Sequence, residues 1–193
     1  MGRLRTAALD LFIERGYDGT TVAEIADRAG LTARTFFRYF TDKREVLFAG
    51  SESLQSGMVA AVRAAPPDAQ PLAAVAAGLD AAATLIGGDH EFSARRQAII
   101  ARTDELRERE LKKLSSLAAA MAQGLRDRGV DDGVARLAAE AGIAVFRVAF
   151  ERWADEPGDR SLSQVIRESM DQLLALSGSM SSDGPGGLPT EED

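Results

Sequence analysis

Apolar residues recur along this chain at intervals of three and four, which is the spacing of one face of an α-helix. Near the start, Leu4, Ala7, Ala8, Leu11 and Phe12 follow that spacing. No stretch alternates apolar and polar residues over several positions, as a half-buried strand does. The pattern therefore predicts an all-α protein with about nine helices.

The first two predicted helices have clear end signals. Gly16 is placed to cap the C-terminus of the first helix. Thr21 and Glu24 have the spacing of a capping box, in which the hydroxyl and the carboxylate satisfy free amides at a helix start. We expect the second helix to run from this box to Gly30.

Two more helices are predicted before residue 63. Thr32 is the expected N-cap of a third helix that extends to Phe40. Asp42 to Glu45 repeats the capping pattern, so we expect a longer fourth helix that continues without a break to Val62. Phe36 and Phe40, four positions apart, are expected to face inward.

The segment "AAPPDAQP" at 64–71 interrupts the helical pattern, because proline lacks an amide proton and clashes with the preceding turn. It is either a boundary between units or a bend inside the second unit. We assign residues 1–48 to a first helical unit, 49–177 to a second helical unit and 178–193 to a disordered tail rich in Gly, Ser, Pro and acidic residues. Further helices are predicted at 71–86, 91–101, 104–128, 132–154 and 161–177, and Ser161 with Gln164 forms another capping box at the start of the last one.

Charge is distributed unevenly along the 193 residues, which carry 23 Lys and Arg against 30 Asp and Glu. The first fifty residues hold eight basic against seven acidic side chains, so the excess of negative charge belongs to the rest of the chain. An acidic protein is a poor partner for nucleic acid overall, but the local field decides, and salt screens charges beyond about 8–10 Å. The first fifty residues therefore remain compatible with DNA.

Composition argues against an enzyme. Cysteine is absent and His90 is the single histidine, next to a Gly-Gly-Asp sequence that favours a polar turn. Without thiols, paired carboxylates near a histidine or a Gly-rich phosphate loop, no catalytic, metal or cofactor site is predicted. No run of about 18 apolar residues is present, and we expect a soluble, cytoplasmic protein with no membrane partner.

The second and third predicted helices, joined by a tight connection containing Gly30, have the pattern of a helix-turn-helix. In such a unit the third helix places its N-terminal residues in the major groove of DNA. The residues expected on its exposed face are Thr32, Ala33, Arg34, Thr35 and Arg38.

The stretch "DGTTVAEIADRAGLTARTFFRYFTDKREVLFAG", residues 18–50, resembles the N-terminal signature of the tetracycline-repressor (TetR) family of bacterial transcriptional regulators. The caps, the Ile25-Ala26 pair, Gly30, the aromatic residues and Lys43 fall in register with that signature, from Arg3 onward. The resemblance implies an N-terminal helix-turn-helix domain followed by a helical domain that binds a ligand and forms a dimer.

The resemblance also implies roles for single residues. Thr21 and Lys43 match positions that hold phosphates, and Tyr39 matches a position that reaches phosphate or the groove wall. Residues 33–35 match the base-reading positions, and the planar fork of Arg34 suits guanine. Other interpretations stay open, since Arg34 could belong to a solvated helix face and Lys43 could be an ordinary surface lysine.

Two features depart from the family pattern. Phe37 stands where tyrosine is usual, so a phosphate hydrogen bond from that ring is lost. The first helix begins almost at Met1, so we expect the basic N-terminal arm of many members to be missing or to lie upstream of this start.

The last two predicted helices carry the strongest apolar faces, and the corresponding helices form the dimer interface in the family. Small residues on 132–154 would permit close approach of a second chain. The alternative is that these faces form the internal core of one chain. The residues proposed for the interface are Leu137, Ala141, Val145, Val148, Trp153, Leu162, Val165, Ile166, Met170, Leu173 and Leu174.

A small-molecule pocket is expected among the helices between 71 and 128, together with residues of the helix at 132–154. Core packing is the alternative for each apolar candidate, and Arg147 could instead form an ion pair across the dimer. With the arginines of the 91–101 segment nearby, an anionic amphiphile such as a fatty-acyl thioester would fit. The candidates are Leu85, Ile86, Phe92, Ile99, Leu117, Met121, Phe146, Arg147 and Phe150.

Taken together, the residues and the resemblance predict a ligand-responsive repressor. It would bind an inverted-repeat operator as a homodimer and be released by a small-molecule inducer of unknown identity. Nothing in the residues encodes the sign of regulation, so an activator remains open. The alternative function is a helical module for protein–protein interaction, which a weak dependence of binding on salt would reveal.

Overall fold

The computed structural model describes residues 1–156 and 160–180, with side chains up to Leu176. Across these ranges the chain forms nine α-helices, one 3₁₀ helix and no strand, which confirms the predicted fold class. The helices are α1 Gly2–Arg15, α2 Val22–Arg28, α3 Ala33–Tyr39, η1 Glu45–Phe48, α4 Ser51–Ala64, α5 Pro71–Ile86, α6 His90–Arg102, α7 Asp104–Arg126, α8 Asp132–Asp155 and α9 Leu162–Met180. The predicted tail at 178–193 is thus helical up to Met180 and otherwise lies outside the described residues.

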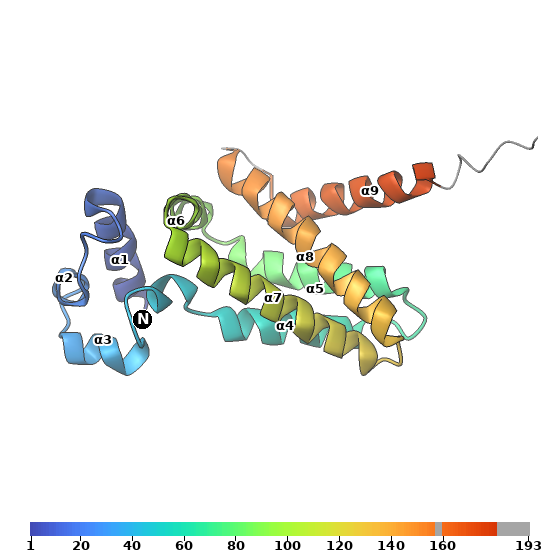
Figure 1. The fold of residues 1–193 in the computed structure, drawn as a ribbon, viewed down its shortest axis with the longest axis horizontal. Coiled ribbons are helices and arrows are strands. Elements are labelled where there is room, and N and C mark those ends of the chain that lie inside the picture. The colour runs from blue at the N-terminus through green and yellow to red at the C-terminus, as the bar shows by residue number, and fades with distance from the viewer. Residues whose placement is uncertain (157–159, 181–193) are drawn as a thin grey trace, which may run out of the picture.

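The molecule is elongated, with α1, α2 and α3 gathered at one end (Figure 1). The longer helices α4, α5, α7 and α8 pack against one another as a bundle, and α9 packs on α5 and α8. Helix α6 contacts α1 on one side and α7 and α8 on the other. It therefore connects the N-terminal helices to the bundle.

An apolar core lies among the N-terminal helices, and the predicted inward direction of Phe36 and Phe40 is confirmed. They are buried with Leu11 and Ile25, and the two phenyl centroids lie 5.3 Å apart. The same core includes apolar residues of η1 together with Ile100 of α6 and Leu106 of α7. The bundle thus helps to hold together a unit that is small for independent folding.

The predicted helix caps are confirmed. The Thr21 hydroxyl accepts from the amide of Glu24 at 3.3 Å, and the Glu24 carboxylate accepts from the Thr21 amide at 2.8 Å. Thr32 accepts from the amide of Thr35 at 3.2 Å at the start of α3. At the start of α9 the Ser161 hydroxyl accepts from the amide of Gln164, and the side-chain oxygen of Gln164 accepts from the amide of Ser161.

The continuous fourth helix predicted up to Val62 is wrong. The structure has the short helix η1, and then Gly50 with φ of 90° before α4 begins. All three apolar residues of η1, at 46–48, are buried, which one face of an α-helix would not achieve for three successive positions. The left-handed backbone of Gly50, which is unfavourable for other residues, separates the two helices.

The bundle brings α5 and α8 into close approach at Gly142. A Cβ added to this glycine would lie less than 3.0 Å from Cγ1 of Val75 on α5. Ala138 and Ala149, which with Gly142 were expected to admit a second chain, are also buried within the single chain. These small residues therefore serve the internal packing of the bundle.

No single helix in the described part of the chain is long and apolar enough to cross a membrane. Helices α5 and α6 reach that length and composition only together, and they are bent by 103° relative to each other. Within the same residues no cluster of His, Cys, Asp and Glu is arranged to hold a metal ion.

Candidate nucleic-acid interface and effector pocket

The start of α3 presents the residues predicted to read bases. Thr32 and Arg34 are exposed, Ala33 and Thr35 are half-buried, and Arg38 is exposed one turn further along. The hydroxyls of Thr32 and Thr35 lie 3.1 Å apart, and the cap fixes both on the first turn. The structure therefore brings this predicted set together on one short helix.

Aromatic side chains extend the exposed surface of α3. Arg38 donates to the Tyr39 hydroxyl at 3.0 Å, and its guanidinium carbon lies 4.9 Å from the centre of that ring. Phe37 is 58% exposed and meets Phe36 edge to face. Phe37 was not among the predicted site residues, although its place directly after the inward-facing Phe36 rotates it out of the core. An exposed phenyl ring beside cations suits apolar contact with a thymine methyl.

Lys43 is half-buried and bonded to backbone. Its ammonium donates to the carbonyl of Tyr17 at 2.7 Å and to that of Thr20 at 3.0 Å, and it lies 4.3 Å from the centre of the Tyr17 ring. An ammonium has three donors, so one remains for a phosphate. Lys43 thus fixes the turn before α2, whose first cap residue is the exposed Thr21.

Three ion pairs among the described residues tie the N-terminal unit to the bundle, and the most exposed of them joins Arg44 to Glu105 of α7 at 3.2 Å. The other two are more shielded. Arg95 of α6 bonds Asp10 of α1 at 2.6 Å. Arg109 of α7 bonds both carboxylate oxygens of Glu45 in η1, at 2.7 and 2.9 Å. Both pairs are partly shielded from water, so a rotation of α1 or η1 against the bundle has to break or rearrange them.

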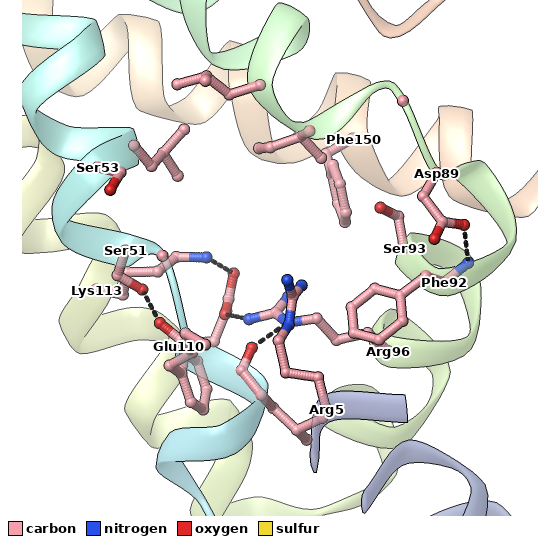
Figure 2. Close-up of a pocket in the computed structure, with 18 of the residues that line it drawn as sticks. Arg5, Ser51, Ser53, Asp89, Phe92, Ser93, Arg96, Glu110, Lys113 and Phe150 are labelled. Atoms are coloured by element: carbon pink, nitrogen blue, oxygen red, sulfur yellow. Dashed lines mark hydrogen bonds and ion pairs between the residues drawn. The ribbon is translucent and has the colours of Figure 1, made fainter. Parts of the chain in front are cut away.

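A cavity of about 520 Å³ lies at this same junction, between α1, η1, α4, the end of α5, α6, α7 and α8 (Figure 2). Its apolar wall includes five residues predicted for the pocket. Phe146 and Phe150 of α8 stack there with ring centroids 6.0 Å apart. The five are Leu85, Ile86, Phe92, Phe146 and Phe150.

The opposite wall of the cavity is charged. Glu110 accepts from Arg96 at 2.8 Å and from Lys113 at 2.6 Å, while Arg96 also donates to the carbonyl of Leu47 at 2.7 Å. Burial alone would raise the pKa of Glu110, but the two cations lower it to about 2. Burial and the charge of Arg96 lower the pKa of Lys113 to about 8.

Four predicted pocket residues lie elsewhere. Leu117 and Met121 are buried in the bundle core, and Arg147 is exposed on α8. Ile99 lines a separate hollow against α1 and the turn that follows it. Sequence reasoning missed Arg5 of α1 and the Glu110–Lys113 pair. Only the i, i+3 spacing of opposite charges on α7 signalled the pair, and nothing signalled Arg5.

The residues proposed for the dimer interface divide into two groups. Leu137 is 72% exposed, and Val148 and Leu174 are also exposed, while Ala141 and Leu173 are half-buried. Val134 and Leu137 with Val148 form an exposed stripe along α8. The remaining residues are already buried within the single chain: Val145, Trp153, Leu162, Val165, Ile166 and Met170.

Both parts of the chain match known protein families. The family model described as "Bacterial regulatory proteins, tetR family" matches residues 4–49, and the model of the "MftR C-terminal domain" matches residues 69–177. The HTH-type transcriptional regulator TcmR of Streptomyces glaucescens is 30% identical over 179 residues, which cover 86% of this chain and 79% of TcmR.

Solved structures show the same fold. The TetR family regulator PfmR of Thermus thermophilus is 27% identical with a TM-score of 0.54, covering 90% of this chain and 97% of PfmR. The regulator FadR of Bacillus subtilis, solved in complex with stearoyl-CoA, is 20% identical with a TM-score of 0.62. That likeness covers 90% of this chain and 97% of FadR.

Proposed function

Because the chain belongs to the tetracycline-repressor family of bacterial transcriptional regulators, we propose that it binds an inverted-repeat operator as a homodimer and is released by a small-molecule effector. The regulators that it matches are not enzymes, and this chain is a regulator too. The observation that carries the DNA-binding part is the capped, exposed start of α3, where Arg34 lies beside two threonines.

The exposed apolar stripe on α8 supports the homodimer. Leu137, at 72% exposure, and Val148 present apolar area to water on a helix that is otherwise well packed. Such a patch marks an interaction surface. Two copies related by a twofold axis would present their α3 helices to successive major grooves, about 34–36 Å apart for adjacent turns. The operator is therefore an inverted repeat.

The position of the cavity supports control by an effector. Residues of α1 and η1 line it together with residues of the bundle, so a bound molecule touches both units. The ion pairs Arg95–Asp10 and Glu45–Arg109 surround the same junction. A ligand that favours one orientation of the two units by about 1–3 kcal/mol changes operator affinity by roughly 5–150-fold.

DNA binding is tested by fluorescence anisotropy with duplexes from the region upstream of the chain's own gene, followed by selection from genomic fragments. We expect selective binding that weakens as salt rises. Arg34→Ala should weaken operator binding by about 1–3 kcal/mol for each base that the guanidinium reads. Arg63→Ala removes an exposed arginine at the end of α4 remote from α3, and it should bind like the wild type. A folded protein that selects no fragment would refute the proposal and favour a protein-interaction module.

Assembly is tested by light scattering. Leu137→Glu should give a folded monomer with strongly reduced operator affinity, because it buries a charge in the proposed interface. Leu111→Glu on α7 changes a comparably exposed leucine, at 62% against 72% for Leu137, outside that stripe and should leave the dimer intact. Equal dimer stability in both variants would exclude the α8 stripe as the interface.

A further inference from the structure

The charged wall of the junction cavity has an excess of positive charge. Five ionisable side chains line it: Arg5, Arg96, Lys113, Asp89 and Glu110. Glu110 is shared between Arg96 and Lys113, and Asp89 accepts from the Phe92 amide at 3.0 Å at the start of α6. Three cations against two carboxylates leave one positive charge without a carboxylate partner.

Arg5 is the cation of this wall that forms no ion pair within the described residues. Its guanidinium carbon lies 4.6 Å from the centre of the Phe92 ring, and no hydrogen bond from its side chain is found within the described residues. Its Nε is buried without an acceptor. Burial and the nearby charge of Arg96 lower the pKa of Arg5, and the smaller effect of the Asp89 carboxylate opposes them. Figure 2 shows Arg5 and Arg96 extending toward each other in the cavity. A guanidinium without a hydrogen-bond acceptor favours binding of a planar anion, because two of its N–H groups can donate to the two oxygens of one carboxylate.

The rest of the lining is mainly apolar, with the hydroxyl side chains of Thr6, Ser51, Ser53 and Ser93 among it. Phe92, Phe146 and Phe150 with the last residues of α5 form a wall of aromatic and aliphatic carbon. A cavity of about 520 Å³ is within the size range of sites for small ligands. The complementary molecule therefore has one anionic end and an apolar body.

Taking the proposed function as its basis, we propose that the effector is an amphipathic monocarboxylate whose acid group binds Arg5 and whose apolar body packs on the phenylalanines of α6 and α8. A single carboxylate matches the single unpaired charge. A nucleotide-bearing thioester would bring several negative charges toward Glu110 and Asp89, and the cavity offers no further cation to balance them.

This assignment makes Arg5 the residue that connects effector binding to the DNA-binding unit. Arg5 lies on α1, whose neighbouring Leu4 is fully buried in the core of that unit. A carboxylate held by Arg5 and packed against α6 and α8 joins α1 to the bundle. Asp10 on the same helix forms an ion pair with Arg95 of α6. The effector therefore adds to the contact between α1 and α6 that is present without it.

Binding is measured without DNA, by calorimetry and by the fluorescence of Trp153, whose ring lies 5.8 Å from that of Phe150. The probes are dodecanoate, naphthaleneacetate, dodecanol as the uncharged analogue of the first, and dodecanoyl-CoA. We expect at least one of the two acids to bind the wild type, and the paired alcohol to bind at least about tenfold more weakly than dodecanoate.

Variants of α1 identify the anion site. Arg5→Met should lower acid affinity at least about tenfold and leave dodecanol binding unchanged, whereas Arg5→Lys should recover part of the affinity. Arg3→Met, an exposed arginine on the same helix, is the matched control and should bind like the wild type. Melting temperatures establish that each variant is folded. Binding of neither acid at millimolar concentration, equal binding by Arg5→Met, or binding of the thioester alone would each overturn the assignment.

A second measurement separates this inference from the proposed function. The acid that binds should weaken operator binding by the wild type and by Arg3→Met, but much less by Arg5→Met. Acid binding by a protein that selects no DNA would refute the proposed operator binding and leave the Arg5 site standing. Selective DNA binding that neither acid affects would refute the effector class and leave the regulator standing.

Discussion

Replacing Gly142 with alanine tests the close packing of α5 against α8. The new methyl group would lie less than 3.0 Å from Cγ1 of Val75, with Cδ1 of Leu79 at 4.0 Å. Val75 and Leu79 are both fully buried, so neither side chain has free space to move into. The clash has to be relieved by separating the two helices or by forcing Val75 out of its preferred rotamer.

The expected cost follows from two opposing effects. Alanine in place of glycine inside a helix stabilises by about 1 kcal/mol. Overpacking a dense core costs about 1–3 kcal/mol, and a contact this short with a rigid β-branched side chain belongs at the upper end. We expect Gly142→Ala to lower the free energy of unfolding by about 1–2 kcal/mol, which for a chain of this size lowers Tm by about 2–8 °C.

Urea and thermal unfolding at one fixed protein concentration measure the effect, because the stability of a dimer depends on concentration. Gly57→Ala on α4 is the control, since its methyl group would meet only Cδ1 of the exposed Leu85, at 3.0 Å. It should be neutral or stabilising. Removing the clash with Val75→Ala in the Gly142→Ala background should recover part of the loss. A Gly142→Ala protein as stable as the wild type would show that α5 and α8 are not in this close approach.

Two further predictions concern the partly buried lysines Lys43 and Lys113. Lys43→Met should lower the free energy of unfolding by about 1–2 kcal/mol in urea, because the carbonyls of Tyr17 and Thr20 lose a charged donor; an unchanged stability with weaker DNA binding would make Lys43 a phosphate ligand alone. Lys113, with its pKa lowered to about 8 beside Arg96, binds fewer protons in the folded than in the unfolded protein above that pH. Wild-type stability relative to Lys113→Met should therefore rise by about 1–2 kcal/mol between about pH 8 and 9.5, and a flat difference in unfolding free energy would contradict it.

Local chemistry made part of this structure predictable. The starts of α2, α3 and α9 each depend on a hydroxyl and a backbone amide three residues apart. The few residues around Thr21, Thr32 and Ser161 were therefore sufficient to predict where these helices begin. The inward direction of Phe36 and Phe40 followed equally from helical spacing. The predicted continuity of the fourth helix was wrong, because Gly50 adopts a left-handed backbone between η1 and α4, and a glycine inside a helical pattern does not by itself signal such a break.

Features that depend on distant segments were beyond the sequence. Arg5 and Lys113 line one cavity although more than a hundred residues separate them, and no local pattern connects the two. Helical spacing also cannot distinguish a face buried in one chain from a face that binds a second chain. Trp153 and Leu137 were therefore assigned to the same interface, although one is buried and the other is largely exposed.

Gly50, with φ of 90°, lies in the segment from η1 to α4 that joins the N-terminal unit covalently to the bundle. The same unit also contacts the bundle through α6 and through the ion pairs Arg95–Asp10 and Glu45–Arg109. A reorientation of α3 relative to the bundle therefore requires changes at the Gly50 backbone and at these noncovalent contacts together. Substitutions at either place are expected to alter the coupling between the two units.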